Sequence, residues 1–501
     1  MDKTKIDILF VRPGNQKKVF GDLGVDLAAI EPPIWAALFA AFLRDKGYSV
    51  AILDCEAENL SPEESAERIA KTVPLLVAYI VTGNNLSSSV WNMLPAREHI
   101  EAFNKIRSGH VKTLIWGLHP SSVPERTLLE EKVDFVCEGE GFDSFPELLN
   151  ILKNDHHAKE FAVRGIWYLK DGKPVSNGRS QVLKDLDELP TPAWDLVPME
   201  RYRAHNWHCF DDVDKRQPYG VIYASLGCPF NCSFCALKRL FDGKPGVRFR
   251  SPEKFMEDLD VLVNKYGIRN IKILDECFVL RKDYVEKVCD MIISRGYDLN
   301  MWAYARIDTV DENILKKLRK AGVRWIAYGI EAGSKKVRDG VSKGRFTQED
   351  IKRVIKLTKD AGIYVVGNFM FGLPDDDLES MKETLDMAKE LNCEYTNFYV
   401  TMAYPGTQLH DEAIKNNVKL PESWIGYSQY SAECLPLSTK HISAADVLKF
   451  RDQAFVDFHA SEDYLSMMRN TFGLKIETHI KGMLSKKIKR NLLSGKKGAK
   501  K

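Results

Sequence analysis

What this sequence lacks already narrows its class. The longest apolar run, Pro32–Leu43, has about a dozen residues, whereas a membrane-spanning helix needs about 20. The N-terminus enters a short mixed segment, Ile6–Val11, which does not resemble a signal peptide. Lys and Arg (72) nearly balance Asp and Glu (70), and the net charge of +2 gives no general attraction to nucleic acid or anionic membranes. We therefore expect a cytoplasmic protein without a transmembrane segment that does not bind nucleic acid.

Cysteine is also scarce, with ten among 501 residues. Most cysteines stand singly, unlike the disulfide framework of a small secreted domain. Three lie together as Cys228, Cys232 and Cys235, and in a reducing compartment such a cluster indicates metal binding or catalysis. The isolated cysteines are expected to be buried small apolar residues: Cys55, Cys137, Cys209, Cys277, Cys289, Cys393 and Cys434.

The remaining composition is that of a folded protein, with 44% apolar residues and a length that allows two to four domains at roughly 150 residues each. Over residues 1–152, short apolar runs alternate with helical patterns, which predicts a parallel sheet covered on both faces. We interpret this unit as a flavodoxin-like doubly wound sheet. Strands are expected near 6–11, 50–53, 75–81, 113–116 and 135–137, and helices near 34–46, 62–72, 88–107, 122–131 and 143–153.

Residues 153–217 lose this alternation. Asp171-Gly172 predicts a hairpin turn, and a Pro-rich stretch follows at 189–198, so we expect a linker with a short hairpin. The aromatic-rich segment Tyr202–Tyr219 either packs between domains, which we favour, or lines the mouth of a cavity.

The strand–helix alternation returns over residues 218–410 and predicts a partial (β/α)6 barrel, whose functional groups would lie at the carboxyl ends of its strands. Residues 411–501 are expected to be helical. The final segment from Ser485 contains no acidic residue, and we expect a solvated tail, with contact to an anionic surface as the alternative. Barrel strands are expected at 221–226, 270–275, 300–305, 324–330, 363–371 and 395–401, and helices at 251–266, 282–295, 311–320, 347–361 and 376–391.

The clustered cysteines have the spacing C-x3-C-x2-C and follow the first strand of this barrel. A structural zinc site normally takes four protein ligands, so three thiolates leave one position open. Thiolates at such short spacing favour an iron–sulfur cluster with one iron free for another ligand. A zinc site completed by a distant fourth ligand is the alternative.

This spacing, with an aromatic residue (Phe234) before the last cysteine, resembles the signature of the radical S-adenosylmethionine superfamily. The resemblance implies a [4Fe–4S] cluster whose free iron chelates the amino and carboxylate groups of S-adenosylmethionine. The reduced cluster would then cleave the sulfonium to a 5′-deoxyadenosyl radical that abstracts hydrogen from an unactivated carbon.

Later segments resemble the same family in the order in which they occur. The resemblance places Asp275 and Glu276 near the methionine amine, Arg306 at the methionine carboxylate, and Glu331 at the ribose hydroxyls, which a carboxylate can accept. A lone Glu or Arg at a strand end is more often part of a structural ion pair, which is the alternative for each residue taken singly. The same family pattern adds Phe234, Ser334, Asn368 and Gly372 to the residues expected around the bound S-adenosylmethionine.

The first domain adds a second resemblance, to the cobalamin-binding domain of class B radical S-adenosylmethionine enzymes. It rests on four segments: 32–35, 46–54, 117–121 and 133–141. No D-x-H-x-x-G motif follows the first strand, so a cobalt-ligating histidine from that motif is not expected, and His119 is expected to pack or hydrogen-bond. The implied cobalamin contacts are Thr82, Gly83, Ser88, Gly117, His119, Glu138, Gly139 and Gly141.

These observations lead to one main hypothesis, a cobalamin-dependent radical S-adenosylmethionine methyltransferase acting on an unactivated carbon. A cyclase, rearrangement or oxidation enzyme on the same scaffold is the first alternative, and a non-catalytic cobalamin-binding sensor is the second. A methylthiotransferase is disfavoured because only Cys55 and Cys137 lie in the first domain, where that family has three cluster cysteines. The expected partners are a small-molecule or lipid-like substrate and an electron donor such as flavodoxin or ferredoxin, with peripheral membrane contact as a possibility.

Overall fold

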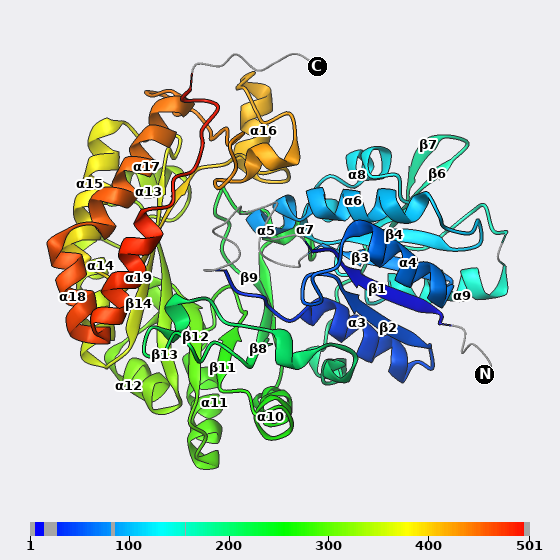
Figure 1. Cartoon of the computed structure of the whole chain (residues 1–501), viewed down its shortest axis with the longest axis horizontal. Coiled ribbons are helices and arrows are strands. Elements are labelled where there is room, and N and C mark those ends of the chain that lie inside the picture. Colours follow the sequence, from blue (N-terminus) through cyan, green and yellow to red (C-terminus); the bar gives the residue numbers. More distant parts are fainter. Residues whose placement is uncertain (1–5, 15–27, 82–85, 156, 495–501) are drawn as a thin grey trace.

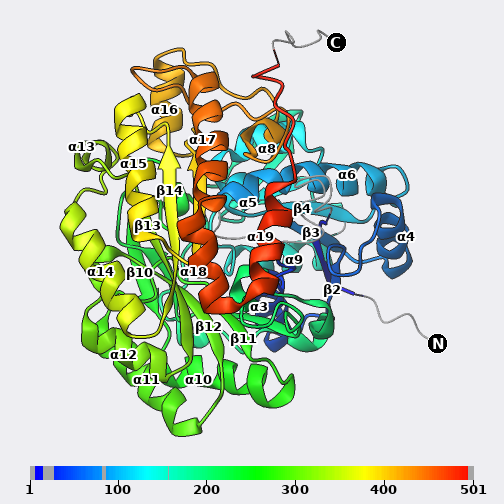
Figure 2. The same cartoon turned by 60° about the vertical axis from the view of Figure 1, so that its left-hand side comes forward.

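The computed structural model describes residues 6–14, 28–81, 86–155 and 157–494. Two α/β units lie side by side, and the C-terminal helices pack on the second unit (Figure 1, Figure 2). Thr82 and Gly83, which we expect to contact cobalamin, lie outside the described residues.

The first unit is built on a seven-stranded sheet in the order β2-β1-β3-β4-β5-β6-β7, of which the first five strands are parallel. The order 2-1-3-4-5 is that of flavodoxin-like folds, and ligands of such sheets bind at the carboxyl ends of the strands. This confirms the predicted fold class. The five parallel strands are β1 (Ile8–Arg12), β2 (Val50–Asp54), β3 (Leu76–Ile80), β4 (Lys112–Trp116) and β5 (Phe135–Cys137).

Helices cover both faces of this sheet. The clearest local signal is α4 (Pro62–Thr72), where the Ser61 hydroxyl accepts from the Glu64 N–H and the Glu64 carboxylate accepts from the Ser61 N–H, which fixes the start of the helix. The helix predicted at 88–107 is divided into two. The helix predicted at 122–131 begins at Pro124, and a separate short helix that ends at Ser122 precedes it. The remaining helices are α3 (Ile34–Asp45), α5 (Leu86–Trp91), α6 (Met93–Asn104), α7 (Leu118–Ser122), α8 (Pro124–Glu130) and α9 (Ser144–Asn154).

The predicted hairpin forms β6 (Ile166–Lys170) and β7 (Lys173–Ser176), but it is not confined to a linker. Strand β6 pairs antiparallel with β5, so the hairpin extends the first sheet beyond residue 152. The Pro-rich chain after it contains only 3-10 turns among its helical elements: η1 (Leu186–Glu188), η2 (Trp194–Leu196), η3 (Met199–Arg201) and η4 (Trp207–Cys209).

The second unit contains six parallel strands in chain order, from β8 at one edge to β15 at the other. Because the two edge strands do not pair among the described residues, the barrel is open, as predicted. The strands are β8 (Tyr219–Ile222), β11 (Asn270–Ile273), β12 (Asn300–Ala305), β13 (Val323–Glu331), β14 (Tyr364–Phe371) and β15 (Tyr395–Val400). The helices that follow these strands are α10 (Pro252–Asp260) with the π-turn η6 (Val261–Lys265), α11 (Lys282–Arg295), α12 (Glu312–Lys320), α13 (Lys335–Gly340), α14 (Gln348–Asp360) and α15 (Leu378–Leu391), with short 3-10 turns η5 (Leu237–Arg239) and η7 (Ile307–Thr309).

The first barrel strand differs from the predicted single strand over 221–226. Strand β8 ends at Ile222, and a separate strand, β9 (Ser225–Cys228), pairs antiparallel with β10 (Gly246–Phe249). The cysteine segment therefore begins on a two-stranded ribbon above the barrel. The sequence pattern could not separate these strands because both are short and apolar.

The aromatic linker segment packs against the barrel. The Trp207 ring lies 5.0 Å from Trp302, 5.4 Å from Trp325 and 5.5 Å from Tyr395, measured between ring centroids. Since Trp325 and Tyr395 lie near the beginnings of their strands, this cluster fills the amino-terminal end of the barrel. The carboxyl end is left for ligands.

The C-terminal region contains the predicted helices, and a turn, η8 (Trp424–Tyr427), lies between the first two of them. The expectation of a solvated tail is wrong for Arg490, whose buried guanidinium forms two contacts of 2.8 Å with Asp452. No helix among the described residues is long and apolar enough to cross a membrane. The helices are α16 (Gln408–Lys415), α17 (Ala444–His459), α18 (Glu462–Phe472) and α19 (Leu474–Leu484).

Candidate active site

The three clustered cysteines are distinguished by their exposure. Cys228, Cys232 and Cys235 are partly exposed, whereas the seven other cysteines are buried. The segment 228–235 lies at the carboxyl side of the barrel, where functional groups of such folds gather. The structure thus supports the prediction that the isolated cysteines are core residues.

The donor set fits an iron–sulfur cluster. Burial raises the pKa of the Cys228 thiol to about 11 and that of Cys235 to about 12, so a positively charged iron centre is needed to hold them as thiolates. No three Cys, His, Asp or Glu side chains in the described ranges are placed to hold a single metal ion. A cubane binds each thiolate through a different iron, so its ligands need not meet at one point.

Asp275 lies beneath the cysteine ribbon. Its carboxylate is fully buried and accepts from the Ala224 N–H at 2.8 Å and from the Ser225 hydroxyl. Burial raises its pKa to about 7. The side chain therefore fixes the connection between β8 and β9, a structural role that sequence reasoning missed, while the adjacent Glu276 is partly exposed.

Arg306 lies beside the cysteine segment, as the family pattern predicts. Its guanidinium carbon is 3.8 Å from the ring centre of Phe230, which lies between the first two cysteines. Asp308 holds the guanidinium through contacts of 2.8 and 3.0 Å. The guanidinium is thus already paired within the chain, which is the structural alternative for this residue, and its role at the methionine carboxylate stays a prediction.

Glu331 ends β13 and forms a buried ion pair with Lys343. Its φ of +66° is unusual for a residue with a side chain. Gly329 provides the space for this pair, because a Cβ there would lie 2.4 Å from Lys343 Nζ and 2.6 Å from Glu331 Oε1. Strained backbone and a glycine-lined carboxylate are features of binding sites. Ser334 follows at the N-cap of α13 and is partly exposed.

The family resemblance implies that Glu331 accepts from the ribose hydroxyls, and on that role we expect Glu331→Gln to weaken S-adenosylmethionine binding about tenfold, through loss of a charged hydrogen-bond acceptor. Isothermal titration of the cluster-containing chain measures this. Glu394→Gln is the matched control, since Glu394 is similarly buried but accepts from the Val365 N–H near the other end of the sheet. Equal weakening in both variants would contradict a ribose contact.

Asn368 and Gly372, which we expect to contact S-adenosylmethionine, each contact other parts of the chain in the structure. The Asn368 amide donates to Tyr328 O at 3.2 Å and accepts from Asn397 at 2.9 Å, which holds it between neighbouring strands. Gly372 has a φ of +84°, and a Cβ there would lie 2.5 Å from Val447 of α17. The glycine therefore admits the C-terminal helix, and a role at adenine stays a prediction. Phe234 packs beside Ala332 and Leu373.

In the first unit, Gly117 and His119 follow β4 at the carboxyl edge. A Cβ on Gly117 would lie 2.1 Å from Val81 O, so only glycine fits this turn. His119 is fully buried, and neither ring nitrogen has a hydrogen-bond partner among the described residues. Such an unpartnered polar group next to a ligand edge is compatible with a bound cofactor. Ser88 lies in α5, beside the same edge.

The loop after β5 is packed against the chain itself. A Cβ on Gly139 would meet Ser180 Oγ at 2.5 Å, and one on Gly141 would lie 3.2–3.3 Å from Phe145, Cys137 and Trp116. Glu138 accepts from Trp167 Nε1 at 2.7 Å. We expected these glycines to admit a nucleotide tail, and the structure gives them a different explanation, close packing. Their part in cobalamin binding stays a prediction.

An ion pair joins the two units at this edge. Arg248 of β10 forms contacts of 3.0 and 3.1 Å with Glu140, which is fully buried. Arg248 lies opposite Leu226, two residues before Cys228 on the paired strand. A second contact joins Lys272 Nζ to Glu31 at 2.7 Å. The sequence contains no local signal for either pair because the partners are more than 100 residues apart.

Comparison with known proteins agrees with this arrangement. The family model for the B12 binding domain matches residues 22–149, and that for the radical SAM superfamily matches residues 222–388. An uncharacterized methyltransferase of Pyrococcus horikoshii is 30% identical over 486 residues, which cover 95% of this chain and 98% of that protein. The chain belongs to the cobalamin-binding radical S-adenosylmethionine family. Its first domain is of the kind that holds cobalamin, and its second domain is of the kind that holds a [4Fe–4S] cluster with S-adenosylmethionine.

Other members of this family carry different activities. An anaerobic magnesium-protoporphyrin IX monomethyl ester cyclase of Rubrivivax gelatinosus is 27% identical, over 81% of this chain and 69% of that protein. The solved structure of the methyltransferase TsrM from Kitasatospora setae, with tryptophan and a S-adenosylmethionine analogue, superposes with a TM-score of 0.68 at 17% identity. It covers 97% of this chain and 96% of that chain, which confirms the shared fold.

Proposed function

We propose that this enzyme transfers a methyl group to an unactivated carbon of a small-molecule or lipid-like substrate. The observation that carries the proposal is the Glu140–Arg248 ion pair, which ties a loop of the cobalamin-binding unit to the ribbon bearing Cys228. The pair brings the loop after β5 to the strand that ends at the first cysteine, so the two expected cofactor sites lie on neighbouring elements. The methyltransferase relative that spans nearly the whole chain supports the same reaction class.

The proposed division of labour assigns cobalamin binding to residues 1–152 and radical chemistry to residues 218–410. When bound, cobalamin supplies a methyl group and the cluster with S-adenosylmethionine supplies a carbon radical. The chain's own residues bind and orient: three thiolates hold the cluster, Arg306 faces a carboxylate, and Glu331 accepts from hydroxyls.

A cyclase, rearrangement or oxidation enzyme is the second candidate, because the cyclase relative shares both domains and 81% of this chain aligns with it. The partly exposed cysteine triplet makes a vestigial sensor the weaker interpretation. We also propose a cytoplasmic location and an electron donor such as flavodoxin or ferredoxin, since the cluster must be reduced before each cleavage.

The test is anaerobic reconstitution with iron, sulfide and hydroxocobalamin, followed by incubation with deuterium-labelled methyl S-adenosylmethionine and candidate substrates. Methyl transfer predicts about four irons and one cobalt per chain, together with S-adenosylhomocysteine, 5′-deoxyadenosine and a labelled product. Deoxyadenosine with an unlabelled, altered product would support the cyclase class instead. Cobalt binding without iron would support the sensor.

A further inference from the structure

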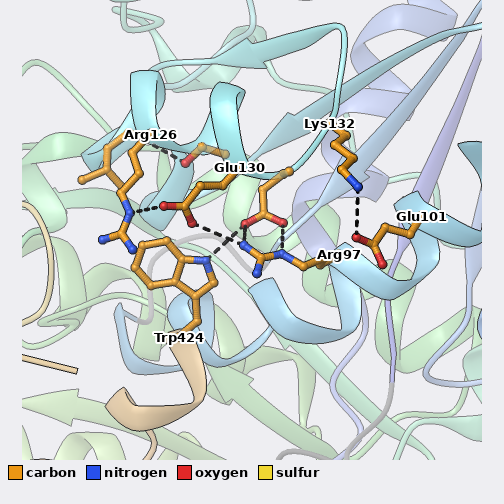
Figure 3. Close-up of polar contacts among 9 residues, drawn as sticks. Arg97, Glu101, Arg126, Glu130, Lys132 and Trp424 are labelled. Atoms are coloured by element: carbon orange, nitrogen blue, oxygen red, sulfur yellow. Dashed lines mark hydrogen bonds and ion pairs between the residues drawn. The ribbon is translucent and has the colours of Figure 1, made fainter. Parts of the chain in front are cut away.

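The turn η8 of the C-terminal region is seated on the cobalamin-binding unit. Figure 3 shows the Trp424 indole against side chains from α6 and α8. Its Nε1 donates to Glu131 at 3.1 Å, and the Arg126 guanidinium carbon lies 4.1 Å from its ring centre. Glu131 is buried and accepts from Arg97 Nε at 2.8 Å. A hydrogen bond and a cation–π contact thus fix one indole at this place.

The same indole ring packs against the imidazole of His119 in a T-shaped contact. The two ring centroids are 4.3 Å apart, and the planes meet at 73°. Burial lowers the pKa of His119 to about 3, assisted by the charges of Arg126 and His410. The ring is therefore neutral, with one donor and one acceptor. Both ring nitrogens are covered by surrounding protein atoms, so the ring acts on the corrin site through the β4–α7 turn that carries it.

The turn also fixes the backbone around this histidine. The His119 N–H donates to Ser89 of α5 at 2.9 Å, and Trp91 of α5 donates to Tyr427 O of the turn at 3.2 Å. Helices α5 and α7 both begin at the carboxyl edge of the first sheet. The shape of this edge consequently depends on a segment about 300 residues further along the chain.

We propose that Trp424 is a positioning residue for cobalamin. It holds His119 and the β4–α7 loop in the conformation that receives the corrin, so the C-terminal region completes a site that the B12-binding domain does not form alone. The proposal rests on the cobalamin site of the proposed function. It goes beyond that function by assigning a third part of the chain to the cofactor.

Titration of the cobalamin-free full chain with hydroxocobalamin, followed by visible absorbance, tests the proposal. We expect Trp424→Ala to raise the dissociation constant about tenfold or more, which is the size of a lost set of buried contacts. Trp424→Phe, which keeps an aromatic face for His119 and Arg126, is expected to stay within about threefold of the wild type. The absorbance spectrum of the bound hydroxocobalamin is compared in the same samples.

Phe458→Ala is the matched control, because Phe458 is equally buried in the C-terminal region but packs on Phe398 of the barrel, 5.6 Å away. The control is expected to bind hydroxocobalamin like the wild type. Equal weakening in Phe458→Ala, or unchanged binding in Trp424→Ala, would overturn the proposal. If Trp424→Ala fails to fold, as judged by iron content, Trp424→Leu is compared with Trp424→Phe, and equal affinities overturn it. A wild type that binds no cobalamin would instead contradict the proposed function.

Discussion

Replacing Cys228, Cys232 and Cys235 together by alanine is expected to reduce bound iron from about four atoms per chain to about none. The three thiols lie on one partly exposed segment, and the seven other cysteines are buried. Formation of 5′-deoxyadenosine from S-adenosylmethionine is expected to fall to the background of the reductant alone. Iron analysis and product chromatography after anaerobic reconstitution measure both effects.

Cobalamin binding separates this loss from general unfolding. Because the cobalamin-binding unit has its own sheet, to which the three cysteines do not belong, the triple variant is expected to bind hydroxocobalamin as the wild type does. Cys289→Ala, which removes a buried thiol of α11, is the control and is expected to keep its iron. Iron retained in the triple variant would mean that other ligands hold the metal, which would contradict the assignment.

The alternation of short apolar runs with helical patterns was sufficient to predict most of the fold. The barrel strands β12 and β15 begin at the predicted residues, and α4 and α11 match their predicted bounds. Helix α4 also has the Ser61–Glu64 capping box at its start. Parallel strands separated by helices leave few topologies, so the strand order followed from the alternation itself. The cysteine spacing was equally local and equally informative.

The sequence could not predict features that depend on distant partners. Asp275 was expected near a methionine amine, yet its carboxylate is used by the backbone of Ala224 and by Ser225, about 50 residues earlier. Gly372 was expected near adenine, and the structure shows in addition that its missing side chain admits Val447. Residue type and strand position are readable from a sequence, but which neighbour fills a space is decided by tertiary packing.

Long-range contacts also explain the errors in domain organisation. The hairpin at 166–176 was assigned to the linker because its strand pattern is local, whereas its pairing with β5 is not. Arg490 belongs to a strongly basic segment, yet its buried guanidinium pairs with the carboxylate of Asp452, which lies 38 residues away in the sequence. A like-charge run predicts exposure only when no partner of opposite charge is folded against it.

Replacing Asp275 by asparagine is expected to remove a large pH dependence of stability. Burial raises the pKa of Asp275 to about 7, above its ordinary value of 3.8. Between these values the native chain keeps a proton that the unfolded chain has released, so this group makes the free energy of unfolding fall as the pH rises to about 7. From pH 5 to pH 8 the wild type is expected to lose about 3 kcal/mol through this group, and Asp275→Asn to lose none of it.

Urea unfolding of the full chain at pH 5, 6, 7 and 8 measures the difference between the two curves. Asp376→Asn is the matched control, since burial raises the pKa of Asp376 to about 6 and its carboxylate accepts from the Gly372 and Leu373 N–H groups. That variant should flatten only the lower part of the curve. Parallel curves for Asp275→Asn and the wild type would show that Asp275 is ionised in the native chain.

Asp275→Ala leaves the Ala224 and Ser225 donors without an acceptor beneath the ribbon. This variant is expected also to lose iron, because Ser225 begins the strand that Cys228 ends.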